Sequence, residues 1–275
     1  MAQLLVIRPD EAVLAAASAG LAGHDLVVSA GNIDALRRLR RLAIDVVITD
    51  ASTSVTEDLA LAVELRAVRP GVKVIVLAPE TTHEDVVAAL RAQVFACFAP
   101  PFDGAEIVAM ARAALEAPEW RHGIEVVSGL PHWMTLRVSC HLLTAERLVR
   151  FMTEREDSLP DRDRDLLMTA FREMLVNAME HGAGFDPAKV IEVTAARTER
   201  AIVYHFRDPG NGFDREDLAH AARSHHAQDL IETVARREHL GLRPGGFGML
   251  LVKQIADELV YNERGNEVLL IKHLT

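Results

Sequence analysis

The stretch EMLVNAMEHG at residues 173–182 spaces Glu173, Asn177 and His181 four residues apart. On a helix, this spacing stacks the three polar groups along one side. The flanking residues predict a helix from about Arg162 to His181, with an apolar stripe of Leu166, Leu167, Ala170, Met174, Leu175 and Ala178. A carboxylate, an amide and an imidazole in one row beside core residues favour a binding role. A solvated polar stripe is the alternative interpretation.

Two glycine-containing loops follow this helix. Strands predicted at residues 190–194 and 201–206 form a hairpin, which leads directly into DPGNGF at 208–213. Gly210 and Gly212 allow positive φ and the close approach of a flat ligand, while the Asp208 carboxylate can accept a hydrogen bond from an exocyclic amine. Farther on, RPGGFGM at 243–249 opens another predicted helix, and free N–H groups at such a start favour phosphate. The chain lacks both the P-loop pattern and the motif set of eukaryotic-type protein kinases.

The order of these motifs resembles the histidine-kinase, gyrase and MutL superfamily of ATP-binding domains. Within that superfamily the chain looks most like the bacterial anti-sigma-factor serine kinases, on the stretch at 173–182 and the closing GNEVLLIKHL at 265–274. The resemblance covers about residues 133–275 and implies an α/β sandwich. It also implies ATP and Mg²⁺ as cofactors.

The resemblance implies a role for each motif residue. Glu173 is then the general base that takes a proton from the attacking hydroxyl, and Asn177 holds Mg²⁺ against the phosphates. Asp208 accepts from the adenine amine in a pocket shaped by Gly210 and Gly212. The remaining ATP-binding residues implied are His181, Arg243 at the end of a lid expected at 214–244, and Gly246 and Gly248, whose backbone N–H groups meet the phosphates.

The first half of the chain alternates strand and helix. Apolar strands predicted at 3–7, 26–29, 45–50, 73–77 and 94–98, each followed by a helix, indicate a doubly wound five-stranded parallel sheet. Asp50 ends the third strand, at the carboxyl edge where such sheets bind ligands. A polar strand end that caps the next turn is the simpler interpretation of Asp50.

This half, over about residues 1–117, resembles a response-regulator receiver domain. The resemblance rests on the fivefold alternation, on Asp50 and on the Pro101–Phe102 pair after the fifth strand. In that family the strand-three Asp accepts a phosphoryl group with help from an acidic pair, a Ser/Thr and a Lys. In this chain Arg8 and Pro9 stand in place of the acidic pair, Ala78 in place of the Ser/Thr and Pro100 in place of the Lys. An aspartyl phosphate needs the charge of a metal ion and a Lys. We therefore predict a pseudo-receiver in which Asp50 is a vestigial phosphoacceptor.

Composition sets the broad class. The chain has 275 residues, 49% of them hydrophobic, and a net charge of −10, which argues against direct nucleic-acid binding. No apolar run approaches the ~20 residues of a membrane helix, and the start lacks the basic region of a signal peptide. Cys97 and Cys140 fit a reducing compartment. We expect a cytoplasmic bacterial protein with a receiver-like domain at 1–120, a linker at 121–131 and an ATP-binding domain at 132–275. Within the linker, residues 124–131 are either a strand or an ordered connection.

Three classes of function remain. The first is an ATP-dependent serine/threonine protein kinase, controlled by the receiver-like domain, that phosphorylates a STAS-domain anti-anti-sigma protein. The same domain would then also bind a sigma factor. The second class is a non-catalytic module that binds ATP and sequesters a partner. The third, a histidine kinase, is disfavoured because no His-Glu-x-x-x-Pro helix precedes the ATP-binding half. Both families often pair, so a homodimer is an open expectation.

Overall fold

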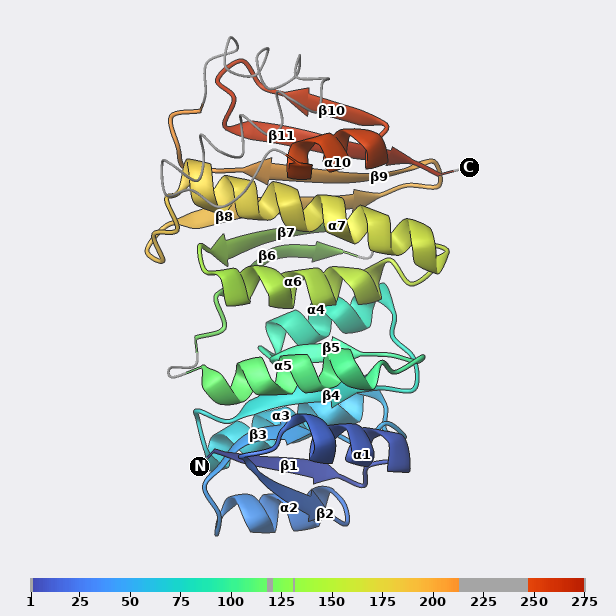
Figure 1. Cartoon of the computed structure of the whole chain (residues 1–275), viewed down its shortest axis with the longest axis vertical. Helices are drawn as coiled ribbons and strands as arrows, with labels where there is room; N and C mark the ends of the chain where they lie inside the picture. The colour runs from blue at the N-terminus through green and yellow to red at the C-terminus, as the bar shows by residue number, and fades with distance from the viewer. Residues whose placement is uncertain (1, 118–120, 131, 213–246, 275) are drawn as a thin grey trace. The chain divides into compact units, whose positions relative to one another are not determined.

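The computed structural model describes residues 2–117, 121–130, 132–212 and 247–274 (Figure 1). The chain forms two compact units. The first comprises residues 1–126 with 146–157, and the second comprises residues 127–145 with 158–275. Helix α6 (Leu142–Arg155) therefore begins in the second unit and continues in the first. Strand β6 (Ile124–Leu130) occupies most of the segment expected as a linker, so the strand alternative holds there. The domain limits 1–120 and 132–275 stand as a proposal.

A five-stranded parallel sheet forms the centre of the first unit, which confirms the predicted fold class. Its strands are β1 (Gln3–Ile7), β2 (Asp25–Ser29), β3 (Ile44–Ile48), β4 (Lys73–Leu77) and β5 (Ala96–Phe98), in the order β2-β1-β3-β4-β5. Neighbouring strands pair in parallel. The whole of β4 is buried because helices cover both faces of the sheet, which is why these strands read as continuous apolar runs.

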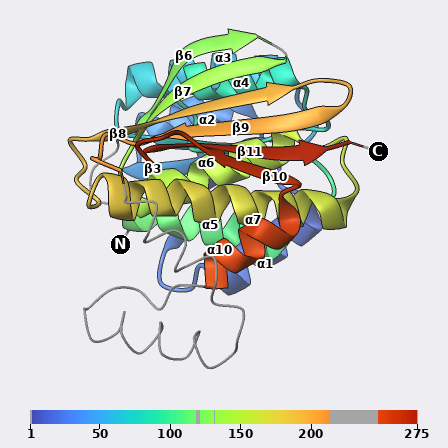
Figure 2. The same ribbon diagram turned by 90° about the horizontal axis from the view of Figure 1, so that it is seen from above.

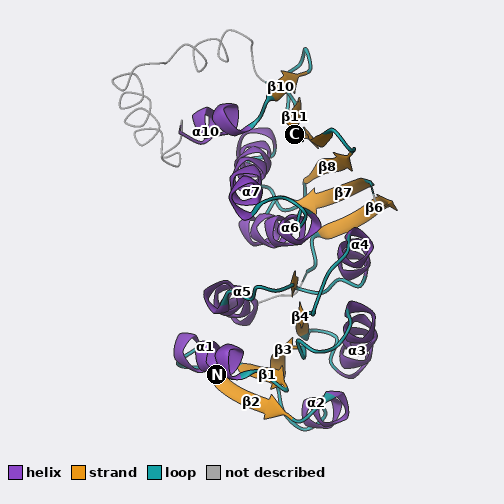
Figure 3. Ribbon diagram, turned by 90° about the vertical axis from the view of Figure 1, so that its right-hand side faces the viewer, coloured by secondary structure: helices purple, strands orange, loops and turns teal. Residues whose placement is uncertain are grey.

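Five helices cover that sheet, α1 and α5 on one face and α2, α3 and α4 on the other (Figure 3). Their bounds are Glu11–Gly20, Asn32–Leu39, Val55–Val68, His83–Arg91 and Gly104–Glu116 in chain order. Capping boxes define two of the starts, Ser54 with Glu57 on α3 and Thr82 with Asp85 on α4. Such reciprocal caps satisfy the first free N–H groups of a helix, so the chain marks these starts locally.

Arg147 of α6 anchors residues 146–157 in the first unit. Its side chain is 1% exposed, and its Nε donates to the Phe95 carbonyl at 2.8 Å. Its Nη1 donates to the His122 carbonyl at 2.6 Å and its Nη2 to the Val94 carbonyl at 3.2 Å. The guanidinium lies 4.7 Å from the centroid of the Phe95 ring. Burial lowers the pKa of Arg147 to about 9 and, with the Arg147 charge, that of His122 to about 3. The buried cation is thus held by carbonyl dipoles and an aromatic face.

The second unit is built on a six-stranded sheet in the order β10-β11-β9-β8-β7-β6. Besides β6, its strands are β7 (Trp133–Ser139), β8 (Val190–Arg197), β9 (Ala201–Arg207), β10 (Glu258–Tyr261) and β11 (Glu267–His273). The pairs β7/β8, β8/β9, β9/β11 and β10/β11 are antiparallel. Helices α7 (Asp161–Asn177) and α10 (Phe247–Ile255) lie on the same face of this sheet (Figure 2). The sandwich confirms the predicted fold class of this half.

Phe171 lies at the centre of the second core. Its ring centroid is 4.8 Å from that of Tyr204 and 5.1 Å from that of Phe206, both on β9. The expected stripe is right for Leu167, Ala170, Met174 and Leu175, which are all buried. It is wrong for Leu166, which is 38% exposed, because α7 turns the face of Phe171 toward the sheet. Among the described residues, no helix is long and apolar enough to cross a bilayer.

Candidate ATP site

The predicted helix to His181 instead ends as a regular α-helix at Asn177. A π-helical turn, η1 (Ala178–Gly182), follows it. The Phe185 N–H then donates to the Met179 carbonyl at 2.8 Å, which closes the turn. The wider turn leaves Glu173 and Asn177 on the last regular turn of α7 and carries Gly182 toward the loop after β9. Such π turns inside helices are frequent at functional sites.

Gly182 brings η1 against the loop that begins at Asp208. A Cβ at residue 182 would overlap the Asp208 carboxyl group, so only glycine fits there. Gly210 lies in the same contact, because its own Cβ would come 2.8 Å from the Gly182 carbonyl oxygen. The Gly210 N–H donates to Asp208 Oδ1 at 2.8 Å. The three residues therefore fix the carboxylate at the end of the helix that carries Glu173 and Asn177.

The start of α10 meets α7 at the two predicted polar residues. A Cβ on Gly248 would overlap Glu173 Oε2, and the Asn177 amide donates to Met249 Sδ at 3.3 Å. The carboxylate and the amide thus lie beside the first turn of α10. Backbone N–H groups in a first turn have no partner within the helix, so this end favours an anion.

The carboxylates of the site differ in their surroundings. Burial raises the pKa of Asp208 above its usual value, while the Gly210 N–H and the Arg264 charge act in the opposite direction. Glu173 is 30% exposed and lies 3.4 Å from the Arg172 guanidinium. The site therefore combines the half-buried carboxylate of Asp208 at one end with the partly exposed carboxylate of Glu173 at the other.

The structure brings together most of the predicted site residues. Glu173 and Asn177 of α7 contact Gly248 and Met249 at the start of α10, while Asp208 contacts Gly210 and, in η1, Gly182. Gly212 adopts a φ of 80° and packs against the Arg264 carbonyl instead. His181 is exposed in η1, and in the described residues no hydrogen bond or ion pair joins it to the others. Arg243, Gly246 and the expected lid at 214–244 lie outside the described residues.

One positioning residue was not assigned from the sequence. Gly182 belongs to the quoted stretch, and a glycine directly after a predicted helix is an ordinary helix stop. Its contact with Asp208, 26 residues away, exists only in the folded chain. A glycine paired in this way with a downstream Asp-x-Gly loop is the signal that could have pointed to it.

The donor set fits Mg²⁺ and ATP. A carboxylate and an amide supply the hard oxygen ligands that Mg²⁺ prefers. Gly248 lies directly beside the Glu173 carboxylate, and the N-terminus of α10 lies at that point. A half-buried Asp208 offers the acceptor that an adenine amine requires.

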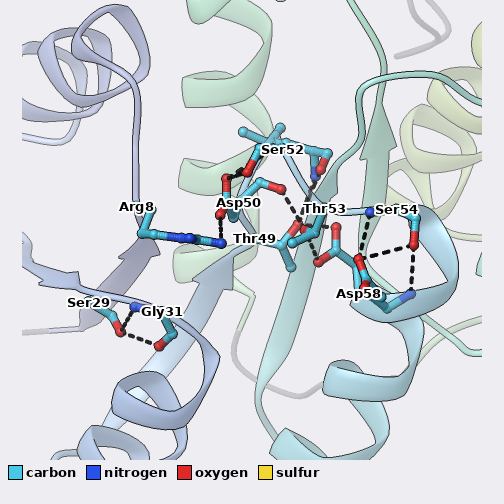
Figure 4. Close-up of polar contacts among 11 residues, drawn as sticks. Arg8, Ser29, Gly31, Thr49, Asp50, Ser52, Thr53, Ser54 and Asp58 are labelled. Carbon is cyan, nitrogen blue, oxygen red and sulfur yellow. Dashed lines mark hydrogen bonds and ion pairs between the residues drawn. The ribbon is translucent and has the colours of Figure 1, made fainter.

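Asp50 lies just after β3, at the carboxyl edge of the first sheet (Figure 4). It is 4% exposed and forms an ion pair with Arg8, which follows β1. Its Oδ1 accepts from the Ser52 N–H at 2.9 Å and from the Ser52 hydroxyl at 2.8 Å. This is the turn-capping arrangement that the simpler interpretation expected.

An open pocket of about 360 Å³ adjoins this aspartate, lined by Arg8, Pro9, Asp10, Asp50, Ala51 and Ser52. A guanidinium therefore lies where a receiver needs acidic ligands for a metal. Within the described part of the chain, no group of three or more His, Cys, Asp or Glu side chains could hold a metal ion. That Asp50 is a vestigial phosphoacceptor stays a prediction.

Comparison with known proteins relates both halves to signalling proteins. Residues 138–272 match the family described as histidine kinase-like ATPase domain. The serine-protein kinase RsbW of Oceanobacillus iheyensis is 25% identical over 109 residues, which cover 39% of this chain and 64% of that protein. The transcriptional regulatory protein GlrR of Escherichia coli is 31% identical over 137 residues, covering 47% of this chain. The chain spans only 31% of the length of that regulator.

Solved structures of receivers are among those similar to part of this chain. A response regulator receiver domain protein (CheY-like) from Methanospirillum hungatei is 19% identical, with a TM-score of 0.37. The match covers 42% of this chain and 94% of that one. The chain thus joins a unit with a receiver-like five-stranded parallel sheet to a C-terminal region that matches the histidine kinase-like ATPase domain family and resembles the serine-protein kinase RsbW.

Proposed function

We propose that this protein is an ATP-dependent serine/threonine protein kinase of the anti-sigma type. Its substrate would be a small STAS-domain protein in a bacterial cytoplasm, and the receiver domain would control it. The same surface would bind a sigma factor, and the kinase half would act as a homodimer. The matched family is an ATPase domain, which supports the nucleotide part of the proposal.

One observation carries the catalytic part of the proposal. Glu173 Oε2 lies against Gly248 at the start of α10, and Asn177, one turn farther along α7, reaches Met249 of the same helix. The proposed base and the proposed metal ligand therefore both contact the first turn of the helix whose N-terminus would bind the anion. Phosphoryl transfer depends chiefly on such positioning and on electrostatic stabilisation.

Each residue has a definite task in this proposal. Mg²⁺-ATP supplies the phosphoryl group to be transferred. Asp208 binds the adenine amine and orients the base. Asn177 holds the cation, and the N–H groups at the start of α10 orient the phosphates. Glu173 is accessible enough to meet a serine hydroxyl and accepts its proton during the transfer.

A phosphotransfer assay tests the proposal. The full chain is incubated with radiolabelled ATP, Mg²⁺ and STAS-domain proteins encoded near its gene, and ATP affinity is measured in parallel. We expect serine or threonine labelling that falls by about 10²–10⁴-fold in Glu173→Gln, with ATP affinity retained. Asp165→Asn removes an exposed carboxylate from the same helix and should leave the labelling unchanged.

The binding-module alternative makes a different prediction. ATP would bind and strengthen capture of a partner, yet no partner would be labelled, and Glu173→Gln would behave as the native chain does. That pattern would reject the kinase and retain the ATP site. Labelling of a histidine within the chain itself would instead point to the disfavoured histidine kinase.

A further inference from the structure

The turn between β10 and β11 is fixed by a single side chain. Asn262 Oδ1 accepts from the N–H groups of Gly265 at 2.7 Å, Asn266 at 3.1 Å and Glu267 at 3.3 Å. The Asn262 N–H also donates to the Glu267 carbonyl at 3.1 Å. One amide oxygen therefore satisfies three backbone donors, which makes this turn rigid.

Asn266 connects this turn to the loop that carries Asp208. Its carbonyl accepts from the Asp208 N–H at 3.0 Å, and its Nδ2 donates to the Asp208 carbonyl at 3.2 Å. The Asn266 Oδ1 accepts from Asn262 Nδ2 at 3.0 Å, and the residue is 7% exposed. Both backbone groups of Asp208 are thereby held from the turn, and its carboxylate lies against Gly182 and Gly210.

Arg264 holds the other end of the same loop. Its carbonyl oxygen lies where a Cβ on Gly212 would be, and Gly212 has a φ of 80°. Its Nε and Nη2 lie 3.4 Å from the carbonyl and Oδ1 of Asn211. The left-handed backbone and the close approach together admit only glycine at residue 212.

We propose that the β10–β11 turn, residues 262–266, is a positioning element of the ATP site that sets where the Asp208 carboxylate meets the purine. This rests on the proposed ATP site and extends it, because residues 262–266 were assigned no part in nucleotide binding. A carboxylate accepts from the amine of adenine but repels the carbonyl of guanine. Correct placement of Asp208 therefore determines preference for ATP over GTP, and a displaced loop loses that preference.

Nucleotide binding to the full chain tests the proposal. Dissociation constants for ATP and GTP are measured with Mg²⁺ by calorimetry for the native chain, Asn266→Ala and Asn262→Ala. We expect ATP affinity to fall about 10-fold in both variants, with GTP affinity changed much less, so the ATP:GTP ratio falls. Glu263→Ala, an exposed neighbour in the same turn, should match the native chain.

The outcomes separate this proposal from the proposed function. If the native chain binds no ATP, the ATP site itself fails. If it binds ATP but both alanine variants keep the native ATP:GTP ratio, the turn has no positioning role and the ATP site stands. Equal losses for ATP and GTP, with a lower melting temperature, would show that the turn only supports the fold and would also overturn the proposal.

Discussion

Asp58 of α3 is fully buried beneath the carboxyl edge of the first sheet, and we predict that its ionisation destabilises the first unit. Burial raises its pKa from 3.8 to about 6, and the charge of Asp50 adds to this, against hydrogen bonds from Thr53 and Thr49. The perturbation we propose is Asp58→Asn, which mimics the protonated acid in shape and charge.

The hydrogen bonds around Asp58 also favour its protonated form (Figure 4). Thr53 Oγ1 lies 2.7 Å from both the Asp50 carbonyl and Asp58 Oδ1. One hydroxyl carries one proton and cannot donate to both acceptors. A protonated Asp58 donates to Thr53 Oγ1 and satisfies the pair, and the amide that Asp58→Asn introduces would do the same.

The magnitude follows from the size of the shift. A native pKa above the unfolded value means that the native state binds the proton more tightly. The contribution to stability is complete below about pH 3.8 and is lost as the pH rises to about 6. At about 1.4 kcal/mol per pKa unit, we expect Asp58→Asn to gain about 2 kcal/mol over the native chain between pH 4.5 and 7.5.

Hydrogen exchange of β3 and β4 measures this within the first unit. Protection factors, corrected for intrinsic rates, should rise about 30-fold in Asp58→Asn relative to the native chain between the two pH values. Glu64→Gln changes an exposed carboxylate on the same helix and should show no such difference. An identical pH profile for Asp58→Asn and the native chain would refute the reasoning.

Four further predictions concern other positions. Arg147→Met removes the guanidinium that donates to the carbonyls of Phe95, His122 and Val94. The unfolding free energy of the first unit, measured by hydrogen exchange, should fall by about 2–4 kcal/mol. A loss no larger than that of the exposed Arg37→Met would contradict this. Gly182→Ala should weaken ATP binding at least 10-fold by displacing Asp208, whereas Gly71→Ala, whose added Cβ would meet open space, should retain affinity. Acetyl phosphate with Mg²⁺ should not label Asp50, since Arg8 occupies the place of the acidic ligands; radiolabel on Asp50 would disprove the pseudo-receiver. Burial raises the pKa of Cys97 to about 12 and that of Cys140 to about 11, so both thiols should resist iodoacetamide at pH 8 in the native chain and react after unfolding.

The elements of the first unit were predictable because their signals are local. The helix expected after the third strand is α3, which begins at a capping box formed by Ser54 and ends just before Pro70. The strands are apolar runs that only a sheet covered on both faces can bury. The spacing of Glu173 and Asn177 likewise predicted one helix side, since the α-helical repeat acts over a few residues.

The site was only partly predictable for the opposite reason. A regular helix to His181 was the natural expectation, but the chain forms a π-helical turn after Asn177, and Gly182 in that turn packs against Asp208. His181 is exposed in the same turn. Nothing in the local sequence couples Asn266 to Asp208, 58 residues apart, or Arg147 to Phe95, 52 residues apart.

By itself, the sequence determined the alternating strands and helices of the first unit, the two fold classes and the motif residues that carry the ATP-site prediction. Strand β10 and the π-helical turn η1 were not predicted from it. Tertiary structure alone decided that Arg8 neutralises Asp50, that the β10–β11 turn holds Asp208 and that α6 contributes its later turns to the first unit. Hydrophobic periodicity and helix caps involve residues close together in the chain, so they can be recognised in the sequence alone. Ion pairs, hydrogen bonds to the backbone of distant residues and positions that only glycine can occupy depend on which distant segments the packed core brings together.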